Sequence, residues 1–231
     1  MNKEVYRRSY ELISEYSRFT DSIRKRSKSQ ITIKELFDLK SVLSNVHNIL
    51  TSIATLATAN KISEILSFNE EQKLNLISSV EETKANTNGF DIKIDDPNKI
   101  LVEVKCNMLL HDKKLGQQQI NSILNDAIKL RNEPPKRRKI DFKTDDYIKV
   151  IVLVDSYHDK LDAVIKQITK EVRCKENTRE TRKERMEIKP YIKPLSSLAE
   201  IKNTQDTAYI YLTTISTEDM ENELQRLISN T

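Results

Sequence analysis

Asp91, Glu103 and Lys105 are the residues whose types and spacing best suit hydrolytic chemistry in this chain. They lie in two short segments, residues 90–95 and 99–106, in which polar and apolar side chains alternate. Carboxylate oxygens are ligands that Mg²⁺ prefers, and a neighbouring ammonium group can hold a phosphate oxygen and orient or activate a water molecule. Two acids and a lysine on one surface therefore suit metal-assisted attack of water on phosphorus.

The alternation predicts that both segments are β-strands, and the Asp-Pro-Asn turn at 96–98 joins them into a hairpin. If the strands pair about Pro97, Asp91 lies directly opposite Glu103. Cross-strand neighbours have Cβ atoms roughly 4.5–5.5 Å apart, so these two carboxylates repel each other. A divalent cation bound between them removes the repulsion and explains the pairing.

The same register divides the hairpin into two faces. The even-numbered face is wholly apolar, whereas the odd-numbered face is charged apart from Leu101. This pattern predicts that one face packs on the core and that the other is polar. Lys105 lies on the polar face opposite Gly89, where the missing side chain leaves room for it.

An acid-x-base triplet carries little information by itself in so charged a chain. With 35 acids and 39 bases among 231 residues, about six such triplets are expected by chance. The hairpin pattern, the facing acid and the adjacent glycine distinguish Glu103-x-Lys105 from the others. The alternative interpretation is an amphipathic hairpin whose charged face is simply solvated.

The segment from Gly89 to Asp91, followed by Glu103-x-Lys105, resembles the motif of the PD-(D/E)xK nuclease superfamily. The resemblance covers the region 68–156, in which a helix, the hairpin, a second helix and a buried strand are expected in that order. It implies that Asp91 and Glu103 ligate Mg²⁺ and that Lys105 assists the attacking water.

Many members of this superfamily place a further acid on the helix before the hairpin. The resemblance assigns this role, as a third metal ligand, to Glu82, with Glu81 as the alternative. Some members also carry a glutamine on the helix after the hairpin, and Gln118 or Gln119 occupies the comparable stretch. The implied site therefore combines three carboxylates with Mg²⁺.

The elements that must hold the hairpin follow from the hydrophobic periodicity. The first eighty residues have helical periods, and a capping box of Ser67 and Glu70 begins the helix before the hairpin. The predicted elements are helices over 33–58 and from 67, the hairpin, a helix from 116, a buried strand over 147–154, a helix from 161, a strand over 208–212 and a closing helix capped by Ser216.

This order predicts an α/β fold. With the resemblance, it implies a restriction-endonuclease-like mixed β-sheet core flanked by helices, together with an α-helical N-terminal region. The predicted boundaries are 1–67 for the helical N-terminal region and 68–231 for the nuclease core with its C-terminal strand and helix.

The composition limits the class of protein. Charged residues make up 32% and the formal net charge is +4, a mildly basic balance that tolerates a polyanionic partner. With only two glycines, Gly89 and Gly116, a phosphate-binding P-loop and a dinucleotide fingerprint are excluded, so no nucleotide cofactor is expected. The cysteines and histidines show no zinc spacing. No apolar run suits a secretory signal or a membrane span, so we expect a cytoplasmic protein with no membrane partner.

Within the superfamily, the small size and the helical N-terminal region look like a type II restriction endonuclease. Such enzymes cut both strands of double-stranded DNA, usually as homodimers. A repair, recombination or mobile-element nuclease remains an alternative, as does a catalytically inert DNA-binding or protein-interaction module. The basic run at 136–139 is a candidate for contact with DNA phosphates, although such runs are more often solvated loops.

Overall fold

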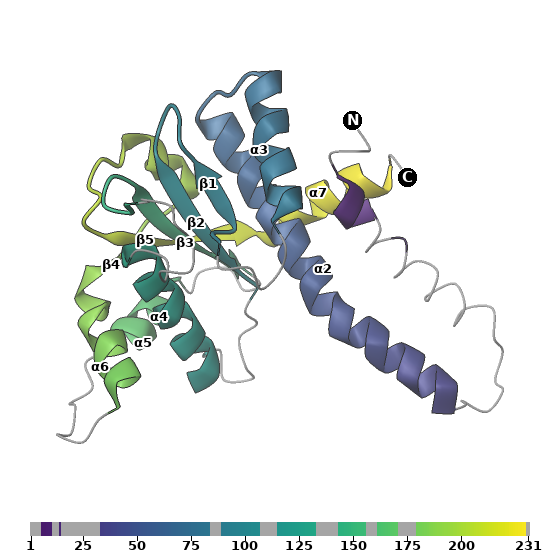
Figure 1. Ribbon diagram of the computed structural model, residues 1–231, viewed down its shortest axis with the longest axis horizontal. Helices are drawn as coiled ribbons and strands as arrows, with labels where there is room; N and C mark the ends of the chain where they lie inside the picture. The colour runs from purple at the N-terminus through teal and green to yellow at the C-terminus, as the bar shows by residue number, and fades with distance from the viewer. Residues whose placement is uncertain are drawn as a thin grey trace.

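Strands rich in β-branched residues form the centre of the molecule, and helices cover both faces of their sheet (Figure 1). The computed structural model describes residues 6–10, 14, 33–83, 89–106, 115–132, 143–155, 161–170 and 179–229. The helices are α2 (Ile33–Ile65), α3 (Glu70–Glu82), α4 (Gln117–Arg131), α5 (Leu161–Thr169), α6 (Glu180–Glu187) and α7 (Thr217–Ile228), with 3₁₀ turns η1 (Lys189–Tyr191) and η2 (Leu198–Asn203). The strands are β1 (Ile92–Ile94), β2 (Ile100–Lys105), β3 (Ile148–Asp155), β4 (Ile192–Pro194) and β5 (Ile210–Ser216). The protein is a mixed α/β fold, as the order of the sequence patterns predicts.

Asn69, not Ser67, caps α3. The Asn69 side chain accepts a hydrogen bond from the Gln72 backbone N–H (2.9 Å), and the Gln72 side chain accepts one from the Asn69 N–H (3.0 Å). The predicted box of Ser67 and Glu70 is therefore wrong, because asparagine caps as well as serine and glutamine closes the box as well as glutamate. Within the described ranges, every helix is too short or too polar to cross a lipid bilayer.

The hairpin has the register that the alternation predicts. Ile92 in β1 pairs with Val102 in β2, and the strands run antiparallel. Asp91 comes directly before β1, so it continues this register toward Glu103 in β2. The local sequence pattern is therefore sufficient to bring these two acids to one end of the hairpin.

The sheet has the strand order β1-β2-β3-β5-β4, in which β1 is antiparallel to β2 and all other neighbours are parallel. Parallel neighbours need a crossover connection, and α4 lies between β2 and β3 in the chain. Strand β4 is not predicted from the sequence. It is a three-residue edge strand, where Pro194 is tolerated because an edge strand leaves half of its N–H groups unpaired.

Each face of the sheet packs against its own hydrophobic core. The first core includes Ile77 of α3 and Val102 of β2 together with residues from the second half of α2. The second core includes Leu101 of β2 and Ile123 of α4 together with residues of α5. Because α2 contributes fully buried side chains such as Ile62 to the first core, the N-terminal helical region packs directly on the sheet.

The odd-numbered face of the hairpin is exposed to solvent only near its turn. Lys93 and Asp95 are exposed, whereas Leu101 and Glu103 have exposed fractions of 0% and 3%. Helix α4 packs over this end of β2. The predicted face is therefore polar at the end that carries the acids, but it is covered there by α4 and not open to solvent along its whole length.

Replacing Ile123 with alanine is expected to lower the free energy of unfolding by about 2–5 kcal/mol, because the truncation leaves a cavity between α4 and the sheet. Ile123 is fully buried, so water does not readily fill the space that the substitution leaves. Leu74→Ala on α3 is the matched control, since that side chain is 39% exposed. Urea unfolding followed by circular dichroism measures both. Equal effects of the two substitutions would contradict the packing of α4.

Candidate functional site

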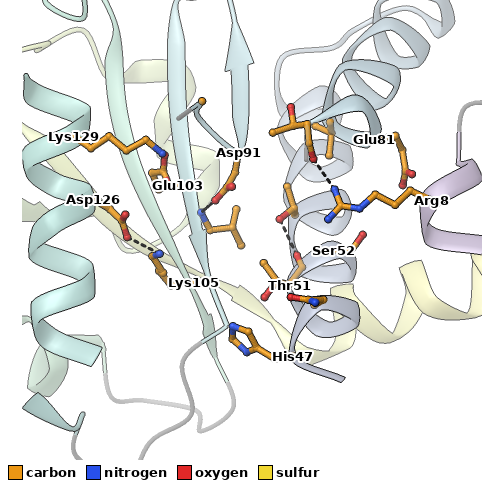
Figure 2. Close-up of a pocket in the computed structure, with 16 residues that line it drawn as sticks. Arg8, His47, Thr51, Ser52, Glu81, Asp91, Glu103, Lys105, Asp126 and Lys129 are labelled. Atoms are coloured by element: carbon orange, nitrogen blue, oxygen red, sulfur yellow. Dashed lines mark hydrogen bonds and ion pairs between the residues drawn. The ribbon is translucent and has the colours of Figure 1, made fainter. Parts of the chain in front are cut away.

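A cavity of about 310 Å³ opens at the carboxyl end of β2. One side, which we call the sheet wall, consists of Asp91, Glu103, Lys105, Asp126 and Lys129. The other side, which we call the helix wall, consists of Arg8, His47, Asn48, Thr51, Ser52, Thr55, Glu81 and Thr83. Figure 2 shows the two walls facing each other, with Asp91 between them. The structure therefore brings all three residues of the predicted motif into one cavity.

Asp91 is held in place by the backbone of β2. Its Oδ2 accepts a hydrogen bond from the N–H of Val104 (2.8 Å). This bond places the Asp91 carboxylate beside Glu103, as the predicted register requires. It uses one oxygen of the carboxylate, and Asp91 itself lines the cavity.

Glu103 is the most deeply buried acid of the site. Burial, reinforced by the nearby negative charge of Asp91, raises the pKa of Glu103 to about 8. Lys129 of α4 opposes this shift through an ion pair between its Nζ and Glu103 Oε1 (2.5 Å). The carboxyl group is thus poised between its neutral and charged forms, and a further cation beside it would favour the charged form.

Lys105 forms its ion pair with Asp126 rather than with either predicted acid. The distance from Lys105 Nζ to Asp126 Oδ2 is 2.7 Å, and both side chains are largely buried. Burial lowers the pKa of Lys105, but the charge of Asp126 and of the other acids outweighs it, so this pKa lies above its ordinary value. Burial also raises the pKa of Asp126, against the attraction of Lys105. Lys105 is therefore an ammonium ion at neutral pH.

The sequence reasoning missed Asp126 and Lys129. They lie three residues apart on α4, at the border of its buried stripe, and so point to the same side of the helix. Gln118 and Gln119, the residues that the resemblance suggests there, do not line the cavity. Gln118 is exposed, and the Gln119 side chain accepts a hydrogen bond from the Gly116 N–H (2.8 Å) at the start of α4. The sequence signal that could have identified Asp126 and Lys129 is a pair of opposite charges beside the apolar stripe of α4.

Glu82 does not reach the site. It is exposed and lines no part of the cavity, whereas Glu81 does. The Glu81 carboxylate accepts hydrogen bonds from the backbone N–H (3.2 Å) and the hydroxyl of Ser9. The choice of Glu82 as third ligand is therefore corrected, and among the acids of the cavity Asp126 lies on the same wall as Asp91 and Glu103.

The sheet wall fits a magnesium ion. The cavity is lined by four acidic and three cationic side chains, so it carries excess negative charge when Glu103 is ionised. Within the described ranges no group of three or more acids, histidines or cysteines is arranged to hold a metal. Mg²⁺ commonly uses only one or two carboxylates and keeps several waters or phosphate oxygens as its other ligands. Asp91 and Glu103 can supply those two carboxylates.

Comparison with known proteins adds no relative. No protein-family model, curated protein or solved structure matches the chain. The function is therefore inferred from the chemistry of the cavity.

The basic run at 136–139 lies outside the described residues. The site as described consists of residues from the hairpin and α4 on the sheet wall and of the residues of the helix wall.

Proposed function

We propose that this protein is a magnesium-dependent endonuclease that hydrolyses phosphodiester bonds of double-stranded DNA. The observation that carries the proposal is the cavity in which Asp91 and Glu103 lie beside a charged Lys105. Two close carboxylates supply a site for a divalent cation, and the ammonium group supplies a contact for a phosphate oxygen. The same three positions form the motif by which the sequence resembles the PD-(D/E)xK superfamily.

When bound, Mg²⁺ supplies a Lewis acid that polarises a phosphoryl oxygen and makes a water molecule more acidic. Asp91 and Glu103 would hold it through their carboxylate groups. Lys105 places a fixed positive charge where negative charge develops on the phosphoryl oxygens. Because its pKa is raised, Lys105 acts as this charge and orients the water rather than accepting a proton.

The two residues of α4 hold the charges of β2 in position. Asp126 fixes the ammonium group of Lys105 through their ion pair. When Glu103 is ionised, Lys129 compensates the charge of the buried carboxylate through their ion pair. Lys129 also lines the cavity, so it would add a second positive charge beside an anionic substrate.

The finer proposal is a type II restriction endonuclease with a restriction-endonuclease-like core, acting as a homodimer on both DNA strands. Support comes from the order of an antiparallel hairpin, the crossover helix α4 and the parallel strand β3, which agrees with what the resemblance implies.

Incubating the purified protein with plasmid DNA and Mg²⁺ tests the proposal directly. We expect linear DNA or discrete fragments, and no cleavage when EDTA removes the metal. A smear of products would retain the nuclease but indicate nonspecific cleavage instead of a restriction enzyme. Intact plasmid at all Mg²⁺ concentrations would overturn the proposal in favour of a catalytically inert module.

A further inference from the structure

The helix wall has a chemistry different from that of the sheet wall. Its only described acid is Glu81, and both oxygens of that carboxylate accept hydrogen bonds from Ser9. The rest of this wall carries an arginine, an imidazole, an amide and hydroxyl groups. The Thr55 and Thr83 hydroxyls already donate to backbone carbonyls, so the donors that this wall offers to a ligand include those of Arg8, His47 and Asn48.

Arg8 provides the positive charge of the helix wall. One guanidinium nitrogen, Nη1, donates to the backbone carbonyl of Thr83 at the end of α3 (2.5 Å). Within the described part of the chain, no carboxylate forms an ion pair with Arg8. A guanidinium group has five N–H donors, and the bond to Thr83 occupies one of them. Figure 2 shows Arg8 reaching from the N-terminal segment toward the space in front of Asp91.

The segment that carries Arg8 is firmly packed against the rest of the fold. Tyr6 is 2% exposed, and its hydroxyl accepts a hydrogen bond from Arg226 Nη2 of α7 (2.7 Å). Ser9 is also buried, and its hydroxyl lies 3.1 Å from that of Ser52 in α2. Contacts on both sides of Arg8 therefore fix the backbone from which it extends.

The α2 part of the helix wall forms a polar stripe that continues from Arg8. His47 and Thr51, like Asn48 and Thr55, recur at helical spacing and line the same cavity. With a rise of 1.5 Å per residue, the stripe from His47 to Thr55 is roughly 12 Å long. His47 and Asn48 are exposed at the end of this stripe, where a ligand leaving the cavity would pass.

We propose that Arg8 and the exposed end of the α2 stripe bind the phosphate backbone of a nucleic-acid strand beside the cleaved bond. The inference rests on the proposed function, because it takes the sheet wall as the place of the reacting phosphate. A ligand that contacts both walls needs anionic oxygens at more than one place, and a nucleic-acid strand carries one phosphate per nucleotide. The planar guanidinium fork binds phosphate oxygens in pairs, which suits a backbone contact.

The test is binding of a fluorescein-labelled DNA duplex, followed by fluorescence anisotropy with Ca²⁺ in place of Mg²⁺ to prevent cleavage. Arg8→Ala is expected to weaken binding by about tenfold or more, as expected when a charge-assisted hydrogen bond is removed. It should also flatten the dependence of log affinity on log salt by about 0.9 for each phosphate that the variant no longer neutralises. Arg182→Ala, which removes an exposed arginine of α6, is the matched control and should change neither quantity.

Two further variants separate phosphate binding from a structural role of Arg8. Arg8→Lys keeps one point charge and should lose part of the affinity. The double variant His47→Ala/Asn48→Ala changes exposed side chains only and should weaken binding with an unchanged melting temperature. Unchanged affinity and salt slope in all three variants would overturn the inference.

The failure of this inference differs from a failure of the proposed function. If the parent protein cleaves plasmid DNA but the Arg8 and His47/Asn48 variants bind the duplex as it does, only the helix-wall inference is overturned. If those variants lose binding but the parent never cleaves with Mg²⁺, the phosphate-binding wall stands and the nuclease proposal falls.

Discussion

Replacing Lys105 with alanine is expected to lower the rate of DNA cleavage by at least about two to three orders of magnitude, because a preorganised charge at the transition state is commonly worth roughly 3–4 kcal/mol. Binding of the same DNA should survive, since one lysine supplies a small part of the phosphate contacts. The measurement is single-turnover cleavage of a plasmid, together with anisotropy for binding.

Lys99→Ala is the matched control for this experiment. Lys99 lies next to the hairpin turn, directly before β2, whereas the site lies at the other end of the hairpin. Its Nζ forms an exposed ion pair with Asp146 Oδ2 (3.3 Å). Its replacement removes one positive charge without touching the cavity, so cleavage should continue at the parental rate. A melting curve of each variant checks that leaving Asp126 without its partner does not unfold the protein. If folded Lys105→Ala cleaves like the parent, the Glu103-x-Lys105 pattern is one of the chance triplets.

The second large effect is a link between pH, Mg²⁺ and the stability of the metal-free protein through Glu103. Its pKa is 4.5 ordinarily and about 8 in the folded chain, because of burial and the charge of Asp91. Between these values the folded chain retains a proton that the unfolded chain has released. Stability therefore falls as the pH rises through this window, and the contribution of Glu103 is on the order of 4 kcal/mol between pH 5 and pH 9.

Glu103→Gln should remove this dependence. In EDTA, the variant and the parent are expected to have similar stability near pH 5, and the variant should be more stable near pH 9. Mg²⁺ should raise the melting temperature of the parent at pH 8 but not that of the variant, because the ion replaces the proton on Glu103. Glu184→Gln, an exposed acid of α6, is the control and should follow the parent. A parallel pH profile for the parent and Glu103→Gln in EDTA would contradict the raised pKa of Glu103. An equal rise of both melting temperatures with Mg²⁺ would contradict the assignment of Glu103 to a metal site.

The sequence by itself determined the hairpin and its register. The alternation around Pro97 specifies which side chains share a face, and a slip of one residue would turn the apolar face toward solvent. The predicted pairing of Ile92 with Val102 is present for this reason. Helix α4 was also predictable, since its apolar residues recur at helical spacing after Gly116. Both patterns are local, so neither needs knowledge of distant parts of the chain.

Only the tertiary structure decided which partners the motif residues have. The pattern of α4 shows which side of the helix is buried, but it does not show how far the helix slides along β2. A shift of one turn would place other side chains beside Glu103 and Lys105, so the sequence pattern does not select Asp126 and Lys129.

The same reason applies to the acid on α3 and to the helix wall. Glu81 and Glu82 are neighbours in sequence, and a helical turn points them in different directions. The docking of Ser9 onto Glu81 joins segments 72 residues apart, and the bond from Arg8 to Thr83 joins residues 75 apart. Hydrophobic periodicity in the sequence indicates which face of a helix is buried. Contacts such as these depend instead on how the packed elements are placed relative to one another. That placement is set by the shared core of α2, α3 and the sheet.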